Sequence, residues 1–133
     1  MLAWLLGEPS GPLARDALAT AEAIAASDLT LLECDRALIR GVATGEVGAA
    51  EAARARALLN RAAAHWNLLR IDSEVVDRAR RPFPAEPLRA LDAIHLASAL
   101  TVAAHVPDLA LLSFDRRIRR AARRLGFSIV PVS

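Results

Sequence analysis

The fold is decided by residues 88–117, which read LRALDAIHLASALTVAAHVPDLALLSFDRR. Residues 90–104 are apolar almost all round, and this pattern is typical of a helix that packs on more than one side. Residues 109–113 form a short apolar run, and a helical pattern over residues 115–125 follows it and stops at Gly126. Short strands that lack an alternation of apolar and polar residues are typical of parallel strands covered on both faces. The stretch therefore predicts an α/β fold.

Outside this stretch the chain repeats the alternation of strands and helices. Further strands are expected over residues 23–28, 67–71 and 127–132, and further helices over residues 1–6, 13–23, 30–43, 49–66 and 74–81. Pro82, Pro84 and Pro87 predict an irregular loop over residues 82–89, because proline cannot lie inside a helix or a central strand. The predicted architecture is a three-layer α/β/α sandwich around a small parallel sheet, with residues 1–133 in a single domain.

The composition excludes several kinds of chemistry. Alanine, with 30 residues, and leucine, with 21, dominate the chain of 133 residues, which favours helix. All 17 basic residues are arginine, so no lysine is present to form a Schiff base or to serve a phosphate-binding P-loop. Cys34 is the single cysteine, which indicates a reducing compartment. The longest uncharged run, residues 93–107, is shorter than the roughly 20 residues that span a bilayer, so we expect a cytoplasmic protein.

Three acidic residues are expected near the carboxyl ends of strands. Asp115 lies just beyond the strand over residues 109–113, Asp92 lies in the first turn of the most apolar helix, and Glu33 lies in the first turn of the helix over residues 30–43. Each alone is also explained as a helix cap or a first-turn acid. Brought to one rim of a parallel sheet, the three carboxylates repel one another unless a cation neutralises them. Mg²⁺ or Mn²⁺ suits such an all-oxygen site, and phosphodiester hydrolysis is the chemistry that needs it.

Basic charge is concentrated between Asp115 and Arg124, where six arginines accompany one acid, a net charge of +5 in a chain whose overall net charge is +2. A helical projection places these arginines on one side and four apolar residues on the other. The arginine side is interpreted as a contact surface for a phosphate backbone, as a solvated face, or as a face that binds an acidic partner segment. Its members are Arg116, Arg117, Arg119, Arg120, Arg123 and Arg124.

Three segments of the sequence resemble the PIN-domain family, in particular the VapC-type toxins of bacterial toxin–antitoxin pairs. They are SDLTLLE at 27–33, LRALDAIHLA at 88–97, and LLSFDRR at 111–117 followed by LGF at 125–127. The resemblance implies a PIN-like fold and an endoribonuclease that depends on Mg²⁺ or Mn²⁺ and acts as the toxin of a type II pair. It also implies a homodimer and an inhibitory cognate antitoxin.

The same resemblance assigns roles to individual residues. It implies that Glu33, Asp92 and Asp115 form the catalytic, metal-binding site, with Ser113 as a supporting hydroxyl. The arginines expected to contact the RNA backbone are Arg89, Arg116, Arg117 and Arg120.

The sequence departs from the family at its beginning. Family members start with a strand that ends in an aspartate, directly before a helix whose counterpart here reads LAWLLGEP at 2–9. The sequence begins inside that helix and so lacks the usual first strand and its carboxylate. Three explanations stay open: a start codon placed too far downstream, a shortened chain, or a degenerate member that no longer cleaves RNA. The alternative function is then that of a catalytically inactive PIN-like protein that binds protein or RNA.

The first explanation makes a definite prediction about the gene. In-frame codons just upstream of Met1 are expected to encode a short apolar stretch that ends in Asp-x-Ser or Asp-x-Thr, and a stop codon there would exclude it.

Overall fold

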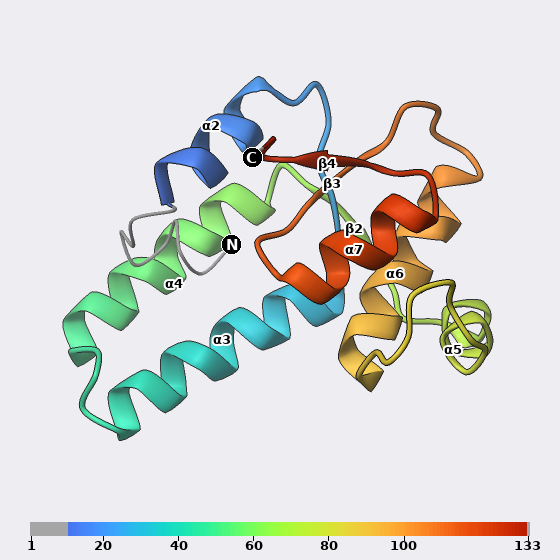
Figure 1. The fold of residues 1–133 in the computed structure, drawn as a ribbon. Coiled ribbons are helices and arrows are strands. Elements are labelled where there is room, and N and C mark those ends of the chain that lie inside the picture. The colour runs from blue at the N-terminus through green and yellow to red at the C-terminus, as the bar shows by residue number, and fades with distance from the viewer. Residues whose placement is uncertain (1–10, 133) are drawn as a thin grey trace. The chain divides into compact units, whose positions relative to one another are not determined.

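A computed structural model describes residues 11–132 and shows a mixed α/β protein (Figure 1). The helix expected over residues 1–6 lies outside the described residues. The chain divides into two compact units, residues 1–69 and residues 70–133, which are described in turn. Each unit combines helices with a pair of short parallel strands, so the prediction of an α/β protein with parallel strands is confirmed.

The first unit contains two strands and three described helices. In chain order they are α2 (Gly11–Thr20), β1 (Ala25–Ser27), α3 (Asp28–Ala43), α4 (Ala49–Ala63) and β2 (Asn67–Leu69). Strands β1 and β2 pair in parallel, with Ala26 opposite Leu68. Helices α3 and α4 run side by side as a hairpin joined by a short loop (Figure 1).

A small apolar core holds α3 against α4. Cys34 and Leu38 contribute to it from α3, and Ala55 and Leu59 contribute from α4. The two members of each pair are four residues apart and therefore share one face of their helix. Leu38 and Leu59 are completely buried, and Trp66 packs against this cluster. The apolar spacing within each helix thus explains the hairpin.

The thiol of Cys34 provides a probe of this core. Burial raises the pKa of the Cys34 thiol, and the neighbouring carboxylates of Glu33 and Asp35 raise it further. Because the reactive species is the thiolate, we expect Cys34 to react with a disulfide reagent at pH 8 about tenfold or more slowly in the native protein than in guanidinium chloride. Equal rates in the two conditions would contradict the buried position.

The raised pKa of the Cys34 thiol also predicts how the stability of the protein changes with pH. A thiol whose pKa is higher in the folded than in the unfolded state favours folding fully only below the unfolded value of about 8.5. We therefore expect the free energy of unfolding to decrease as the pH rises above this value. A Cys34→Ala variant, measured by denaturation at the same pH values, should lack this part of the decrease.

The second unit contains three helices and two strands. They are α5 (Ser73–Ala79), α6 (Ala90–Ala103), β3 (Ala110–Leu112), α7 (Arg116–Arg124) and β4 (Ser128–Val130). Strands β3 and β4 pair in parallel, with Leu111 opposite Ile129. Asp72 caps α5, since its carboxylate accepts a hydrogen bond from the amide of Val75 at 3.0 Å. Residues 82–89 contain neither helix nor strand, as their prolines predict.

Helix α6 lies at the centre of the core of the second unit. It packs against α7, α5 and the loop over residues 82–89, so the prediction that it packs on more than one side is confirmed. The buried members of this core are Val75, Phe83, Ala85, Ala93, Leu96, Ala97, Ala121 and Ala122. Although α6 is strongly apolar, neither it nor any other helix among residues 11–132 has the length and hydropathy needed to cross a membrane.

The strands differ in detail from the prediction. Each described strand has three residues, and they form two separate pairs instead of one sheet. The first residue of each strand is exposed, so the expectation that the strands are covered on both faces is wrong at these positions. An apolar run predicts that a segment is mostly buried, but it does not show where strand pairing begins.

Candidate active site

Asp92 lies at the N-terminal end of α6, in a buried position. Its carboxylate oxygen Oδ2 accepts a hydrogen bond from the backbone amide of Arg89 at 3.2 Å and another from the Nε of the same arginine at 3.2 Å. The side chain of Asp92 is only 5% exposed. A buried carboxylate is costly unless it is hydrogen-bonded or paired with a cation, and Arg89 supplies both kinds of partner.

Asp115 lies at the N-terminal end of α7 and caps that helix. Its Oδ1 accepts hydrogen bonds from the amides of Arg117 at 2.8 Å and Ile118 at 3.2 Å. The hydroxyl of Ser113 accepts a hydrogen bond from the amide of Asp115 at 3.1 Å, which orients the turn before the helix. The interpretation of Asp115 as a helix cap is therefore confirmed. The cap uses only Oδ1 of the carboxylate, so Oδ2 takes no part in capping the helix.

The guanidinium of Arg89 brings these two carboxylates together. Its Nη2 lies 3.7 Å from Oδ2 of Asp115, while its Nε contacts Oδ2 of Asp92. Two acidic residues from the starts of different helices thus share one cation. The sequence suggested Arg89 only as a contact for the RNA backbone, whereas here it lies between two of the predicted acidic residues.

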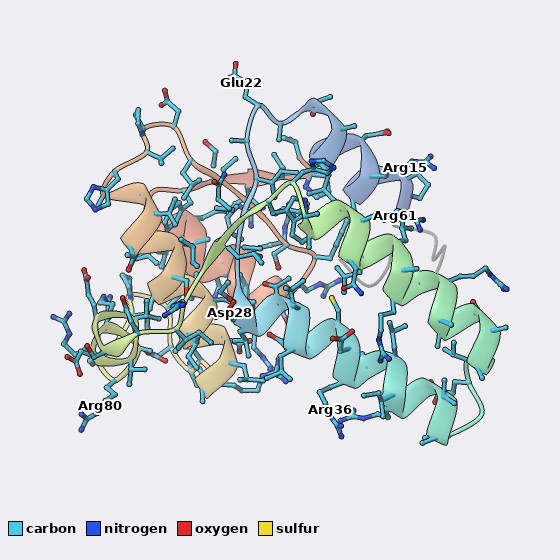
Figure 2. The ribbon with its side chains drawn as sticks, turned by 180° about the vertical axis from the view of Figure 1, so that it is seen from behind. Arg15, Glu22, Asp28, Arg36, Arg61 and Arg80 are labelled. Atoms are coloured by element: carbon cyan, nitrogen blue, oxygen red, sulfur yellow. The ribbon has the colours of Figure 1, made fainter. Side chains whose placement is uncertain are left out.

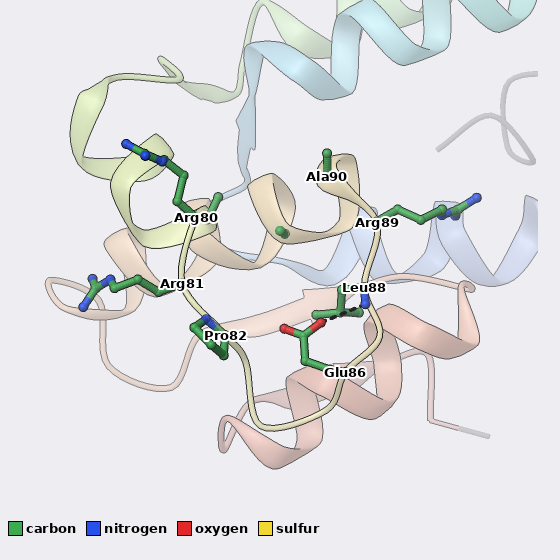
Figure 3. Close-up of a pocket in the computed structure, with 9 residues that line it drawn as sticks. Arg80, Arg81, Pro82, Glu86, Leu88, Arg89 and Ala90 are labelled. Atoms are coloured by element: carbon green, nitrogen blue, oxygen red, sulfur yellow. Dashed lines mark hydrogen bonds between the residues drawn. The ribbon is translucent and has the colours of Figure 1, made fainter.

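The loop that carries Arg89 is held in place by a neighbouring carboxylate. Glu86 accepts hydrogen bonds from the amides of Phe83 at 2.8 Å and Leu88 at 2.9 Å. Figure 3 shows the contact with Leu88 beside a cavity of about 310 Å³. The guanidinium groups of Arg80, Arg81 and Arg89 extend away from the loop (Figure 3). Charged and apolar residues together line the cavity, and one of the charged residues, Arg89, contacts the carboxylates of Asp92 and Asp115.

The exposed arginines of α7 differ in their contacts. Arg116 and Arg117 are exposed at the start of the helix and remain available to a ligand. Arg120 and Arg124 are exposed too, but they also donate to the loop carbonyls of Glu86 at 3.4 Å and Pro84 at 2.9 Å. The expected RNA contacts at the start of α7 therefore lie beside Asp115, whereas Arg120 helps to fix the loop.

Arg119 contradicts the prediction that all six arginines lie on an open face. It is only 8% exposed, and its guanidinium donates to the carbonyls of Ser113 at 2.7 Å and Pro131 at 2.8 Å. A helical projection places it at the border of the arginine side, next to the apolar Ala122. Its acceptors lie just after β3 and β4, outside the helix, so the pattern of the helix alone could not identify this role.

Glu33 is described in the first unit, on α3. This helix begins at Asp28, labelled in Figure 2, and not at residue 30 as predicted. Glu33 therefore lies in the second turn of the helix and not in the first. It is half-buried. Ser27, the residue before the helix, adopts an extended conformation and makes no capping hydrogen bond with its side chain.

The donor atoms at Asp92 and Asp115 suit a hard divalent cation. They offer two carboxylates, with the hydroxyl of Ser113 nearby, and a positively charged group already lies between them. Mg²⁺ in proteins is commonly held by one or two carboxylates and retains several water molecules, so two carboxylates are donors of the kind that it prefers. Within residues 11–132, no three His, Cys, Asp or Glu side chains are close enough together to hold a metal ion.

Comparison with known proteins places this arrangement in a family. The model of the PIN domain matches residues 1–124. Ribonuclease VapC46 of Mycobacterium tuberculosis (strain ATCC 25618 / H37Rv) is 36% identical over 127 residues, which cover 95% of this chain and 87% of the relative. Ribonuclease VapC35 of Mycobacterium tuberculosis (strain CDC 1551 / Oshkosh) is 39% identical over 67 residues, which cover 47% of this chain and 50% of that relative. The chain belongs to the PIN-domain family, as its three motif segments suggested.

Proposed function

We propose that this chain is a ribonuclease that requires a divalent cation and acts as the toxin of a type II toxin–antitoxin pair. The observation that carries the proposal is the convergence of Asp92 and Asp115 on one cationic group in a member of the PIN-domain family. The similarity to Ribonuclease VapC46 over 95% of the chain supports RNA as the substrate. PIN-domain ribonucleases generally use divalent metals, and Mg²⁺ or Mn²⁺ is the proposed ion.

Asp92 and Asp115 are the proposed ligands of the cation, and the family resemblance supports Glu33 as a further proposed catalytic acidic residue. A bound divalent cation supplies positive charge that acidifies water and stabilises the charge that develops on the attacked phosphate. Ser113 holds the backbone of Asp115 in position through its hydroxyl. The exposed Arg116 and Arg117 beside Asp115 are proposed to bind the phosphate backbone.

The remaining features of the proposal concern assembly. We propose that the two units act together as one domain, which is supported by a family match that extends across both of them. A cognate antitoxin, a homodimer and a cytoplasmic location complete the proposed function.

One observation favours a second candidate, a catalytically inactive PIN-like binding protein. Asp115 caps α7 through two hydrogen bonds to its Oδ1, and Asp92 accepts a hydrogen bond from the amide at the start of α6. Carboxylates kept for these structural reasons need no catalytic role. Under this alternative, the exposed arginines bind RNA or an acidic protein segment without cleavage.

Incubation of the 133-residue chain with a mixed RNA substrate distinguishes the two candidates. We expect cleavage with Mg²⁺ or Mn²⁺ and none with excess chelator, because the proposed chemistry depends on a cation between carboxylates. An Asp92→Asn protein, purified identically, controls for contaminating nuclease. RNA that is bound but left intact under every metal condition would favour the inactive binding protein.

A further inference from the structure

One arginine contacts both of the carboxylates that are proposed as ligands of the metal ion. The Nε of Arg89 lies 3.2 Å from Oδ2 of Asp92, and its Nη2 lies 3.7 Å from Oδ2 of Asp115. The second oxygen of Asp115, Oδ1, is engaged by the amides at the start of α7. A cation that binds Asp115 without uncapping α7 must therefore approach the oxygen that faces Arg89.

Burial differs sharply between the three side chains. The side chain of Asp92 is 5% exposed and that of Asp115 is 38% exposed, whereas that of Arg89 is 66% exposed. A charge as deeply buried as that of Asp92 needs a permanent counter-ion. The guanidinium of Arg89 can move into solvent without uncovering the core, and pairs with such an exposed partner are weak. The carboxylates are fixed, and the cation is the replaceable member.

We propose that Arg89 is an internal counter-ion that competes with the divalent cation for Asp92 and Asp115. The inference rests on the proposed function, because it takes these two carboxylates as metal ligands. In the metal-free protein Arg89 neutralises the pair and stabilises the starts of α6 and α7. When a divalent cation binds, the guanidinium is displaced from both oxygens. The affinity for the cation is therefore lower than the carboxylates alone would give, in proportion to the time that Arg89 occupies them.

Titration with Mn²⁺, followed by the paramagnetic signal of the free ion, measures this competition without any cleavage assay. We expect Arg89→Gln to bind Mn²⁺ about 3- to 10-fold more tightly than the wild-type chain, since the competing charge is absent. Arg123→Gln is the matched control. It removes the same charge from an exposed position on α7 and should change the affinity less than about twofold.

A second variant and a stability measurement keep the proposal testable even if Arg89→Gln folds poorly. Arg89→Lys retains the charge but cannot contact both carboxylates with one planar group, so its affinity for Mn²⁺ should lie between those of the wild type and Arg89→Gln. In chelator, Arg89→Gln should melt at a lower temperature than Arg123→Gln, and added Mn²⁺ should restore more of its stability than that of the wild type.

The outcomes separate this inference from the proposed function. Tighter binding by Arg89→Gln alone supports the competition. If the wild-type chain binds Mn²⁺ in a way that depends on Asp92, but Arg89→Gln binds it with equal or lower affinity, the competition is overturned. The proposed metal site then still stands. Absence of Mn²⁺ binding in every variant would overturn both.

Discussion

The Asp92→Asn variant is expected to cleave RNA about 100-fold or more slowly than the wild-type chain while it keeps its fold. Asparagine has nearly the shape of aspartate, and its amide oxygen can still accept the hydrogen bond from the amide of Arg89. What it loses is the negative charge in a buried position, and with it the proposed ability to hold a divalent cation. Loss of several kcal/mol of charge stabilisation in the transition state corresponds to such a decrease in rate.

The measurement is the initial rate of cleavage of one RNA at saturating Mg²⁺, together with circular dichroism and thermal melting of both proteins. Asp77→Asn is the matched control, because it removes the same charge from an exposed residue of α5 in the same unit. A rate for Asp92→Asn within a few-fold of that of Asp77→Asn would remove Asp92 from the catalytic site. Such a result would indicate either that the protein is catalytically inactive or that its catalytic site is formed by other residues.

Asp115 allows its two roles to be separated with the same assay. Asp115→Asn keeps an acceptor for the amides of Arg117 and Ile118, whereas Asp115→Ala removes the cap at a cost of about 1 kcal/mol. Both variants should lose cleavage, but only Asp115→Ala should lose stability. Full cleavage by Asp115→Asn would restrict this residue to capping.

The largest expected effect on stability is that of Arg119→Met, about 3 kcal/mol or more. The guanidinium of Arg119 is buried and donates to the carbonyls of Ser113 and Pro131 at 2.7 and 2.8 Å. Hydrogen bonds from a charged donor are worth about 1.5 to 3 kcal/mol each, and methionine leaves both acceptors without this donor. For a chain of this size the melting temperature should decrease by about 10 °C.

Arg123→Met provides the comparison, because it makes the same chemical change at an exposed position of the same helix. Its effect should stay within about 0.5 kcal/mol. Arg119→Lys should also be destabilised, since a single ammonium group does not reproduce the planar fork that reaches two carbonyls. If chemical denaturation gives the same midpoint for Arg119→Met and Arg123→Met, Arg119 does not contribute to the core as the structure indicates.

The positions of the helices could be predicted from the sequence because their signals are local. The cap at Asp72, the proline-rich loop and the apolar character of residues 90–104 each act within a few residues, and the observed helices follow them. The same holds for the cap at Asp115. The lengths of the strands were predicted less well, because pairing partners decide where a strand begins and an apolar run does not identify them.

The sequence predicted which residues form the candidate site, but it did not predict the contacts between their side chains. The bridge from Arg89 to Asp115 depends on the path of the loop before α6 and on its packing against α7. The burial of Arg119 depends on carbonyl groups at the ends of two strands. Both are contacts between different structural elements, and neither leaves a periodic signal in the chain.

The double use of Asp115 restricts which substitutions can remove the proposed ribonuclease activity alone. One oxygen of this side chain caps α7 and the other faces Arg89, so most substitutions weaken the helix as well as the site. Such alleles lower the amount of folded protein and with it every interaction of the chain. Asparagine is one nucleotide change away from aspartate and retains the capping acceptor. Lineages that keep the protein as a silent, folded binding partner should therefore carry asparagine at position 115 more often than any other replacement.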